Sequence, residues 1–201
     1  MFSVIFHEFA HGYTAYLRGD DTAYLSDRLS FNPLPHIDPV GTIIMPAICI
    51  LSGFPAIGWA KPVPVNPARL LNPRRDMPLV ALSGPASNVL LAAISFVMWK
   101  VFALGFMGPD LTVTLLKTLQ FGVIINLGLA IFNLIPVYPL DGSQMALGWL
   151  SGTWLEVYER HIPYGMYIML ALVLTGLVKY IIIAPLSIAL SALYLLGFRP
   201  F

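Results

Sequence analysis

The chain has 201 residues, of which 58% are hydrophobic and only 10% are charged, and its mean hydropathy is +0.79. Soluble domains carry roughly 25% charged residues, so this composition excludes an ordinary soluble protein and indicates an integral membrane protein. The net charge of +1 gives no reason to expect nucleic acid as a partner. The length fits one membrane domain that covers residues 1–201.

Residues 1–17 form the first predicted helix and carry a His-Glu-x-x-His motif. His7 and His11 are one helical turn apart on one face, so both imidazoles can reach one metal ion, with Glu8 placed to handle a water on that metal. A catalytic zinc site also needs a third protein ligand and an open fourth position. Because a spanning helix needs about 20 residues, this helix is either a marginal span or one that has lost residues upstream of Met1.

Residues 18–38 are polar and rich in turn residues, so they predict a loop, in which we interpret His36 as a surface or loop-pinning residue rather than a metal ligand. Residues 41–58 are apolar but interrupted by proline and glycine. They form either a short spanning helix or, as we favour, a segment that enters the membrane and returns. Residues 59–66 have two prolines and alternating valines, a pattern typical of an extended edge strand.

Two long apolar helices are predicted at residues 77–106 and 111–134, joined by a short turn and packed antiparallel. The first contains a run of small residues at 83–88, which lets another helix approach closely. We interpret Asn88 as a hydrogen-bonding contact between helices rather than a substrate contact.

Residues 133–142 read Asn-Leu-Ile-Pro-Val-Tyr-Pro-Leu-Asp-Gly and end the second long helix. The two prolines stop the helix and Gly142 permits a sharp turn, so we expect Asp141 on rigid, non-helical backbone at the membrane edge. There it suits the third ligand position, although an ordinary Asp-Gly turn is the alternative. In the last hydrophobic block, residues 162–201, we expect Lys179 and Pro185 to divide two short helices.

The predicted fold is an all-α polytopic membrane protein, with about five to six transmembrane or partly inserted helices and a small β or re-entrant element. Its two motifs, together with residues 58–66 and 83–88, resemble the site-2 protease family of intramembrane zinc metalloproteases, in the small prokaryotic branch that lacks accessory domains.

The resemblance implies one Zn²⁺ per chain, bound by His7, His11 and Asp141, with Glu8 as the general base. It also implies that Asn133 contacts the scissile carbonyl or its oxyanion, with a helix cap or an interhelical hydrogen bond as the alternative. The implied activity is that of a metalloendopeptidase that cuts membrane-anchored protein substrates in or near a transmembrane segment, as in regulated intramembrane proteolysis.

A metal transporter or sensor without proteolysis is the competing interpretation, because intramembrane His and Asp residues also mark ion pathways. Glu8 favours the peptidase, since a transporter needs ligands whereas a peptidase also needs a base. The exposed strand predicted within residues 61–65 could pair with an unwound substrate segment.

Basic residues predict the orientation in the membrane. Six of the eleven Lys and Arg residues lie between the first helix and the helix that starts at Met77, whereas the turn at 105–110 has none. The positive-inside rule places that long loop in the cytoplasm and the turn outside. If residues 41–58 are re-entrant, the metal site lies toward the cytoplasmic side of the cell membrane.

Overall fold

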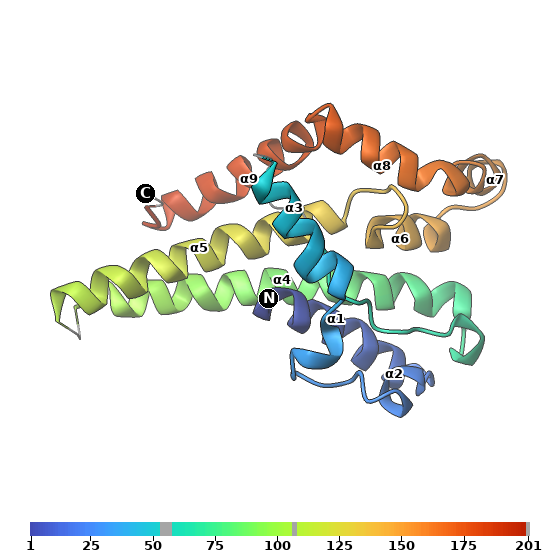
Figure 1. The fold of residues 1–201 in the computed structure, drawn as a ribbon, viewed down its shortest axis with the longest axis horizontal. Coiled ribbons are helices and arrows are strands. Elements are labelled where there is room, and N and C mark those ends of the chain that lie inside the picture. The colour runs from blue at the N-terminus through green and yellow to red at the C-terminus, as the bar shows by residue number, and fades with distance from the viewer. Residues whose placement is uncertain (53–57, 106–107, 200–201) are drawn as a thin grey trace. The chain divides into compact units, whose positions relative to one another are not determined.

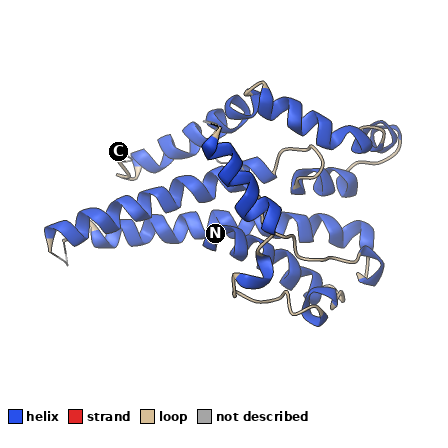
Figure 2. Ribbon diagram, in the orientation of Figure 1, coloured by secondary structure: helices blue, strands red, loops and turns tan. Residues whose placement is uncertain are grey.

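The computed structural model describes residues 1–52, 58–105 and 108–199, which form helices and irregular segments without a strand (Figure 2). This confirms the all-α class. The chain divides into two compact units, Met1–Gly84 and Pro85–Phe201.

The first unit is built around the helix that carries the His-Glu-x-x-His motif. Its elements are α1 (Phe2–Leu17), α2 (Thr22–Leu25), the 3₁₀ turns η1 (Leu34–His36) and η3 (Pro67–Arg69), the π-helix η2 (Pro39–Ile44), α3 (Met45–Leu51) and the start of α4 (Pro73–Phe102). α2 packs against α1. Asp38 caps η2. The hydrogen bond that its carboxylate accepts from the Gly41 amide holds the pKa of this carboxyl below its usual range.

The segment that was predicted to be re-entrant is a short apolar helix, Pro39–Leu51. Thirteen residues are fewer than the roughly 20 that a span needs, but residues 53–57 lie outside the described part of the chain, so re-entry stays a prediction. The strand expected at residues 59–66 is not confirmed. These residues have no regular secondary structure, because their amides bond to a helix end, a loop carbonyl and side chains instead of a neighbouring strand.

The second unit contains the rest of α4, followed by α5 (Pro109–Asn133), α6 (Asp141–Trp149), α7 (Thr153–Glu159), η4 (Ile162–Tyr164), α8 (Gly165–Leu174) and α9 (Leu177–Leu195). Within this unit α4 and α5 lie side by side (Figure 1), and the Asn88 amide donates to Asn126 across 3.0 Å. Further along α4, Ser95 lies opposite Gly122 of α5. The contact position rises from 88 to 95 on α4 while it falls from 126 to 122 on α5. The two helices therefore run antiparallel, as predicted.

The last hydrophobic block breaks earlier than predicted. α8 and α9 are separated at Gly176, whose φ of +71° is a left-handed conformation that glycine adopts at little cost. Lys179 and Pro185 therefore do not divide the block, and Pro185 lies inside α9. Helices in membranes tolerate such a proline where the backbone groups that it frees are satisfied locally.

Among the described residues, three helices are long and apolar enough to cross a membrane, namely α4, α5 and α9. This finding supports an integral membrane protein. The expected five to six spans are not confirmed, since α1 has 16 residues and α8 has 10.

Candidate metal centre

His7 and His11 converge on one point on the buried face of α1. Their exposed fractions are only 6% and 9%, and their Nε2 atoms are 3.0 Å apart. Two nitrogens that each lie about 2.05 Å from one tetrahedral zinc ion are about 3.3 Å apart. The two imidazoles are therefore spaced as a pair of ligands to one metal ion.

A carbonyl of α4 orients the ring of His11. The Nδ1 atom of His11 lies 2.7 Å from the backbone oxygen of Val80. Because a carbonyl oxygen only accepts hydrogen bonds, Nδ1 carries the proton, and Nε2 directs its lone pair toward His7. Such a bond on the outer nitrogen is the usual way in which proteins orient a metal-binding histidine.

Gly84 leaves the space in which the two imidazoles meet. It lies one turn after Val80 on α4, and a Cβ atom placed there would be 2.5 Å from Nε2 of His7 and still closer to Nε2 of His11. Any side chain would occupy the place where the nitrogens converge. The donor atoms and this space together fit a bound zinc ion.

Glu8 contacts the irregular segment at residues 59–66. Its Oε2 atom accepts a hydrogen bond of 2.8 Å from the Val63 amide. The side chain of Val63 lies over Gly12, one turn after Glu8 on the same face of α1. This hydrogen bond fixes the position of one of the two carboxylate oxygens and leaves the other available.

Asp141 belongs to the second unit, where it is the first residue of α6. The prediction of non-helical backbone is therefore wrong for Asp141 itself, although the residues between α5 and α6 are irregular. Gly142 explains the tight junction, because a Cβ atom there would lie 2.6 Å from the backbone oxygen of Ile135. A carboxylate in the first helical turn is also favoured by the helix dipole.

Asn133 is the last residue of α5, also in the second unit. Its Nδ2 atom donates to the backbone oxygen of Leu129, one turn earlier in the same helix, across 3.0 Å. The assignment of Asn133 and Asp141 to the centre formed by the histidines remains a prediction.

Of the two structural roles predicted for His36, the structure shows loop pinning and excludes a surface position. Its side chain is fully buried, its Nε2 atom bonds to the backbone oxygen of Ser30 across 2.9 Å, and its own carbonyl accepts the Lys61 amide. No sequence pattern indicated that the Val80 carbonyl and the Val63 amide contact the motif. Gly84 alone had a signal, the run of small residues at 83–88.

Comparison with known proteins gives the family. The family model described as "Peptidase family M50" matches residues 100–176. A protein of Bacillus subtilis (strain 168), "Putative zinc metalloprotease YwhC", is 36% identical over 183 residues, which cover 90% of this chain and 80% of the relative. The chain belongs to peptidase family M50, the site-2 protease family.

Two further relatives have names of the same kind. MJ0611 of Methanocaldococcus jannaschii is 37% identical over 91 residues, which cover 45% of this chain and 43% of the relative. Rip2 of Mycolicibacterium smegmatis is 27% identical over 142 residues, which cover 71% of this chain and 52% of the relative. No solved structure matches this chain. M50 membership makes the chain a membrane metalloendopeptidase, and the family implies zinc as its metal.

Proposed function

We propose that this M50 chain is one intramembrane domain, residues 1–201, that binds a single zinc ion through His7, His11 and Asp141 and uses Glu8 as its general base. The observation that carries the proposal is the convergence of two buried imidazole nitrogens, 3.0 Å apart, beside a carboxylate held by a backbone amide. Asp141 supplies the oxygen ligand that a His₂-carboxylate zinc site requires.

Each residue has a separate part in peptide hydrolysis. Zinc, when bound, lowers the pKa of a coordinated water to about 7 and polarises a carbonyl. Glu8 accepts the proton of the attacking water and passes it to the leaving amine. The Val63 amide fixes one carboxylate oxygen, so the other oxygen carries the proton. Asn133 turns its amide from Leu129 toward the scissile carbonyl or its oxyanion.

The substrate class is a membrane-anchored protein that is cut in or near its transmembrane segment. A helical substrate must first unwind, because its backbone carbonyls are bonded within the helix. Strand addition at residues 61–65 is one way to hold the unwound chain. The amides of Lys61 and Val63 and the carbonyls of residues 61–62 are already bonded within the first unit, so this pairing relies on the Val65 amide and on the carbonyls of residues 63–65.

The centre lies toward the cytoplasmic side of the membrane. The reason is the basic loop between α1 and α4, which the positive-inside rule places in the cytoplasm. Water reaches the centre from that face, since the bilayer interior holds almost none.

The test compares the wild type with Glu8→Gln in detergent, by zinc content and by cleavage of a transmembrane-segment reporter. We expect about one zinc per chain in both proteins and a rate about 10²- to 10⁴-fold lower in the variant, because the general base is removed. Glu159→Gln, an exposed glutamate on α7, is the matched control and should cut at the wild-type rate.

Two other results would contradict the proposal. Zinc bound without cleavage by the wild type would favour a metal transporter or sensor. Absence of zinc from both proteins would disprove the metal site. Asp141→Ala extends the test, since loss of the third ligand should reduce the zinc content while Glu8→Gln leaves it unchanged.

A further inference from the structure

Arg28 is a buried cation in the first unit that the proposed chemistry does not use. Its exposed fraction is 7%, and among the residues that the structure describes it has no carboxylate partner. A buried charge is costly unless other groups compensate it. Part of the compensation comes from the backbone, because Nη2 of Arg28 donates to the carbonyl oxygens of Lys61, across 2.7 Å, and of Pro62, across 3.2 Å, whereas its buried Nε atom has no hydrogen-bond partner among the described residues.

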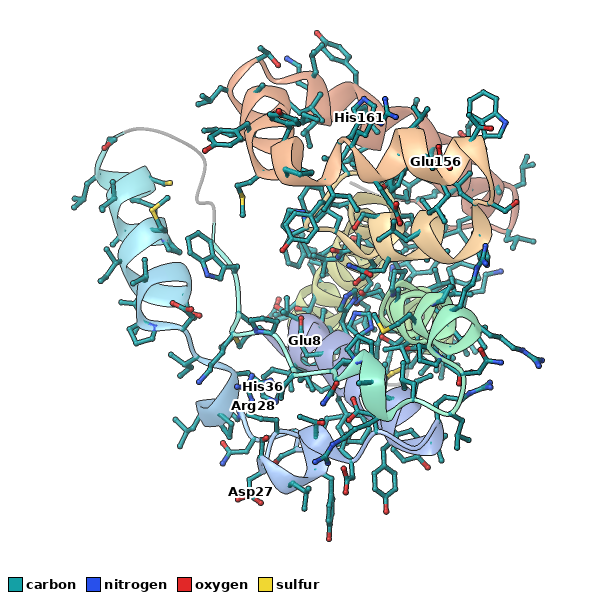
Figure 3. The ribbon with its side chains drawn as sticks, turned by 90° about the vertical axis from the view of Figure 1, so that its right-hand side faces the viewer. Glu8, Asp27, Arg28, His36, Glu156 and His161 are labelled. Carbon is teal, nitrogen blue, oxygen red and sulfur yellow. The ribbon has the colours of Figure 1, made fainter. Side chains whose placement is uncertain are left out.

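One peptide group joins Arg28 to the Glu8 carboxylate. The Pro62 oxygen, which accepts from Arg28, and the Val63 amide, which donates to Oε2 of Glu8 across 2.8 Å, belong to the same planar unit. Figure 3 labels Glu8 and Arg28, which approach this segment from α1 and from the loop after α2. A cation on the carbonyl polarises the peptide group, which makes its N–H a stronger donor to the carboxylate.

Further contacts fix the path of residues 59–63, here named the strap. The Lys61 amide donates to the backbone oxygen of His36 across 2.9 Å, and His36 is itself fully buried. Val63 packs over Gly12, where a Cβ atom would come within 2.9 Å of its Cγ1 atom. The strap is thus held by the loop at Lys61 and by α1 at Val63. The guanidinium of Arg28 binds the two carbonyls that lie between these points.

We propose that Arg28 is a positioning residue of the general base, which holds the Pro62–Val63 peptide group so that its amide keeps the Glu8 carboxylate in place. The inference rests on the proposed role of Glu8. It assigns Arg28 no contact with the metal ligands, so removal of Arg28 should affect turnover and leave zinc binding intact.

The test uses the full chain in detergent, as Arg28→Met, Arg28→Lys and the control Arg75→Met, whose exposed side chain lies in the first turn of α4. For Arg28→Met we expect kcat to fall about 10- to 100-fold, with KM and zinc content unchanged, as for other residues that orient a catalytic group. Arg28→Lys retains a cationic donor and should recover part of kcat. Arg75→Met should match the wild type.

Three results would overturn the inference. An unchanged kcat in Arg28→Met would show that the base does not depend on Arg28. Loss of zinc together with activity would show that Arg28 only maintains the fold. A rise of KM alone would place Arg28 at the substrate instead of the base.

A second measurement does not depend on cleavage. In the wild type, the ¹H resonance of the Val63 amide should lie downfield, as a strong donor does, and both Arg28→Met and Glu8→Gln should move it upfield. If the wild type cuts no reporter but this pattern appears, the proposed function fails while the link from Arg28 to Glu8 stands. If the Val63 resonance is the same in all three proteins, the link is disproved whatever the activity.

Discussion

The proposed zinc-binding pair depends on a residue that contributes no ligand atom. His7 and His11 can converge only where the neighbouring helix leaves room, and Gly84 is the residue at that place. The same stretch of α4 supplies the Val80 carbonyl that orients His11. One turn of α4 therefore both orients one imidazole and leaves space for the metal.

We predict that Gly84→Ala loses zinc. The added methyl would lie 2.5 Å from Nε2 of His7, so the imidazoles must separate and the affinity for zinc should fall by at least about 10- to 100-fold. Alanine favours a helix over glycine by up to about 1 kcal/mol, so weakening of α4 is not the cause. Elemental analysis gives the zinc content, and circular dichroism gives the helix content.

Gly128→Ala is the matched control. Gly128 also lies inside a long helix, α5, but a Cβ atom there meets no other atom within 4 Å. This variant should bind zinc like the wild type. A Gly84→Ala protein with full zinc content would contradict the view that this glycine shapes the centre.

Sequence spacing predicted the residues of the motif but not the groups around them. The four-residue interval between His7 and His11 determines their common face, because helical geometry is local. The bond between Glu8 and the Val63 amide joins positions 55 residues apart, and it depends on the path of a segment without regular structure. Backbone donors have no side-chain signature, so no pattern of residue types could indicate this contact.

Among the elements, hydropathy predicted the long helices well and the irregular segments poorly. The antiparallel pair of α4 and α5 follows from two apolar runs and a short turn. The predicted division at Lys179 and Pro185 was wrong because Gly176 adopts a left-handed conformation, whereas a proline inside a membrane helix costs less than in water. Residues 59–66 have the residue pattern of an edge strand, but two of their amides donate to the side chains of Glu8 and Asp20 instead of to a neighbouring strand.

We predict that the α4–α5 pair is stabilised by the bond between Asn88 and Asn126, both of them buried. Hydrogen bonds between membrane helices contribute about 0.6 kcal/mol on average and up to about 1.7 kcal/mol. Asn88→Ala, Asn126→Ala and the double variant form a cycle, measured by unfolding in mixed detergent. A coupling energy in that range is expected, and strictly additive effects would show that the bond contributes nothing.

At the scale of the whole molecule, composition predicted the membrane environment and basic residues predicted the orientation. The charged fraction of 10% leaves no soluble alternative, and three helices in the described part of the chain have the length and hydropathy of spans. The number of spans could not be predicted, because a short apolar segment can cross, re-enter or lie at the interface.

The orientation can be measured because the chain has one cysteine, Cys49, which is buried. In a Cys49→Ser background, Ala68→Cys reports on the basic loop before α4, and Gly108→Cys reports on the turn before α5. Both positions are exposed, and Gly108 has no close neighbours that a side chain would disturb.

We expect a membrane-impermeant maleimide to label Gly108→Cys in intact bacteria and Ala68→Cys only after permeabilisation, since basic loops are retained in the cytoplasm. The unsubstituted background should remain unlabelled in both conditions. The reverse labelling pattern would place the basic loop outside the cell. Water and the substrate would then reach His7, Glu8 and His11 from the outer side of the membrane.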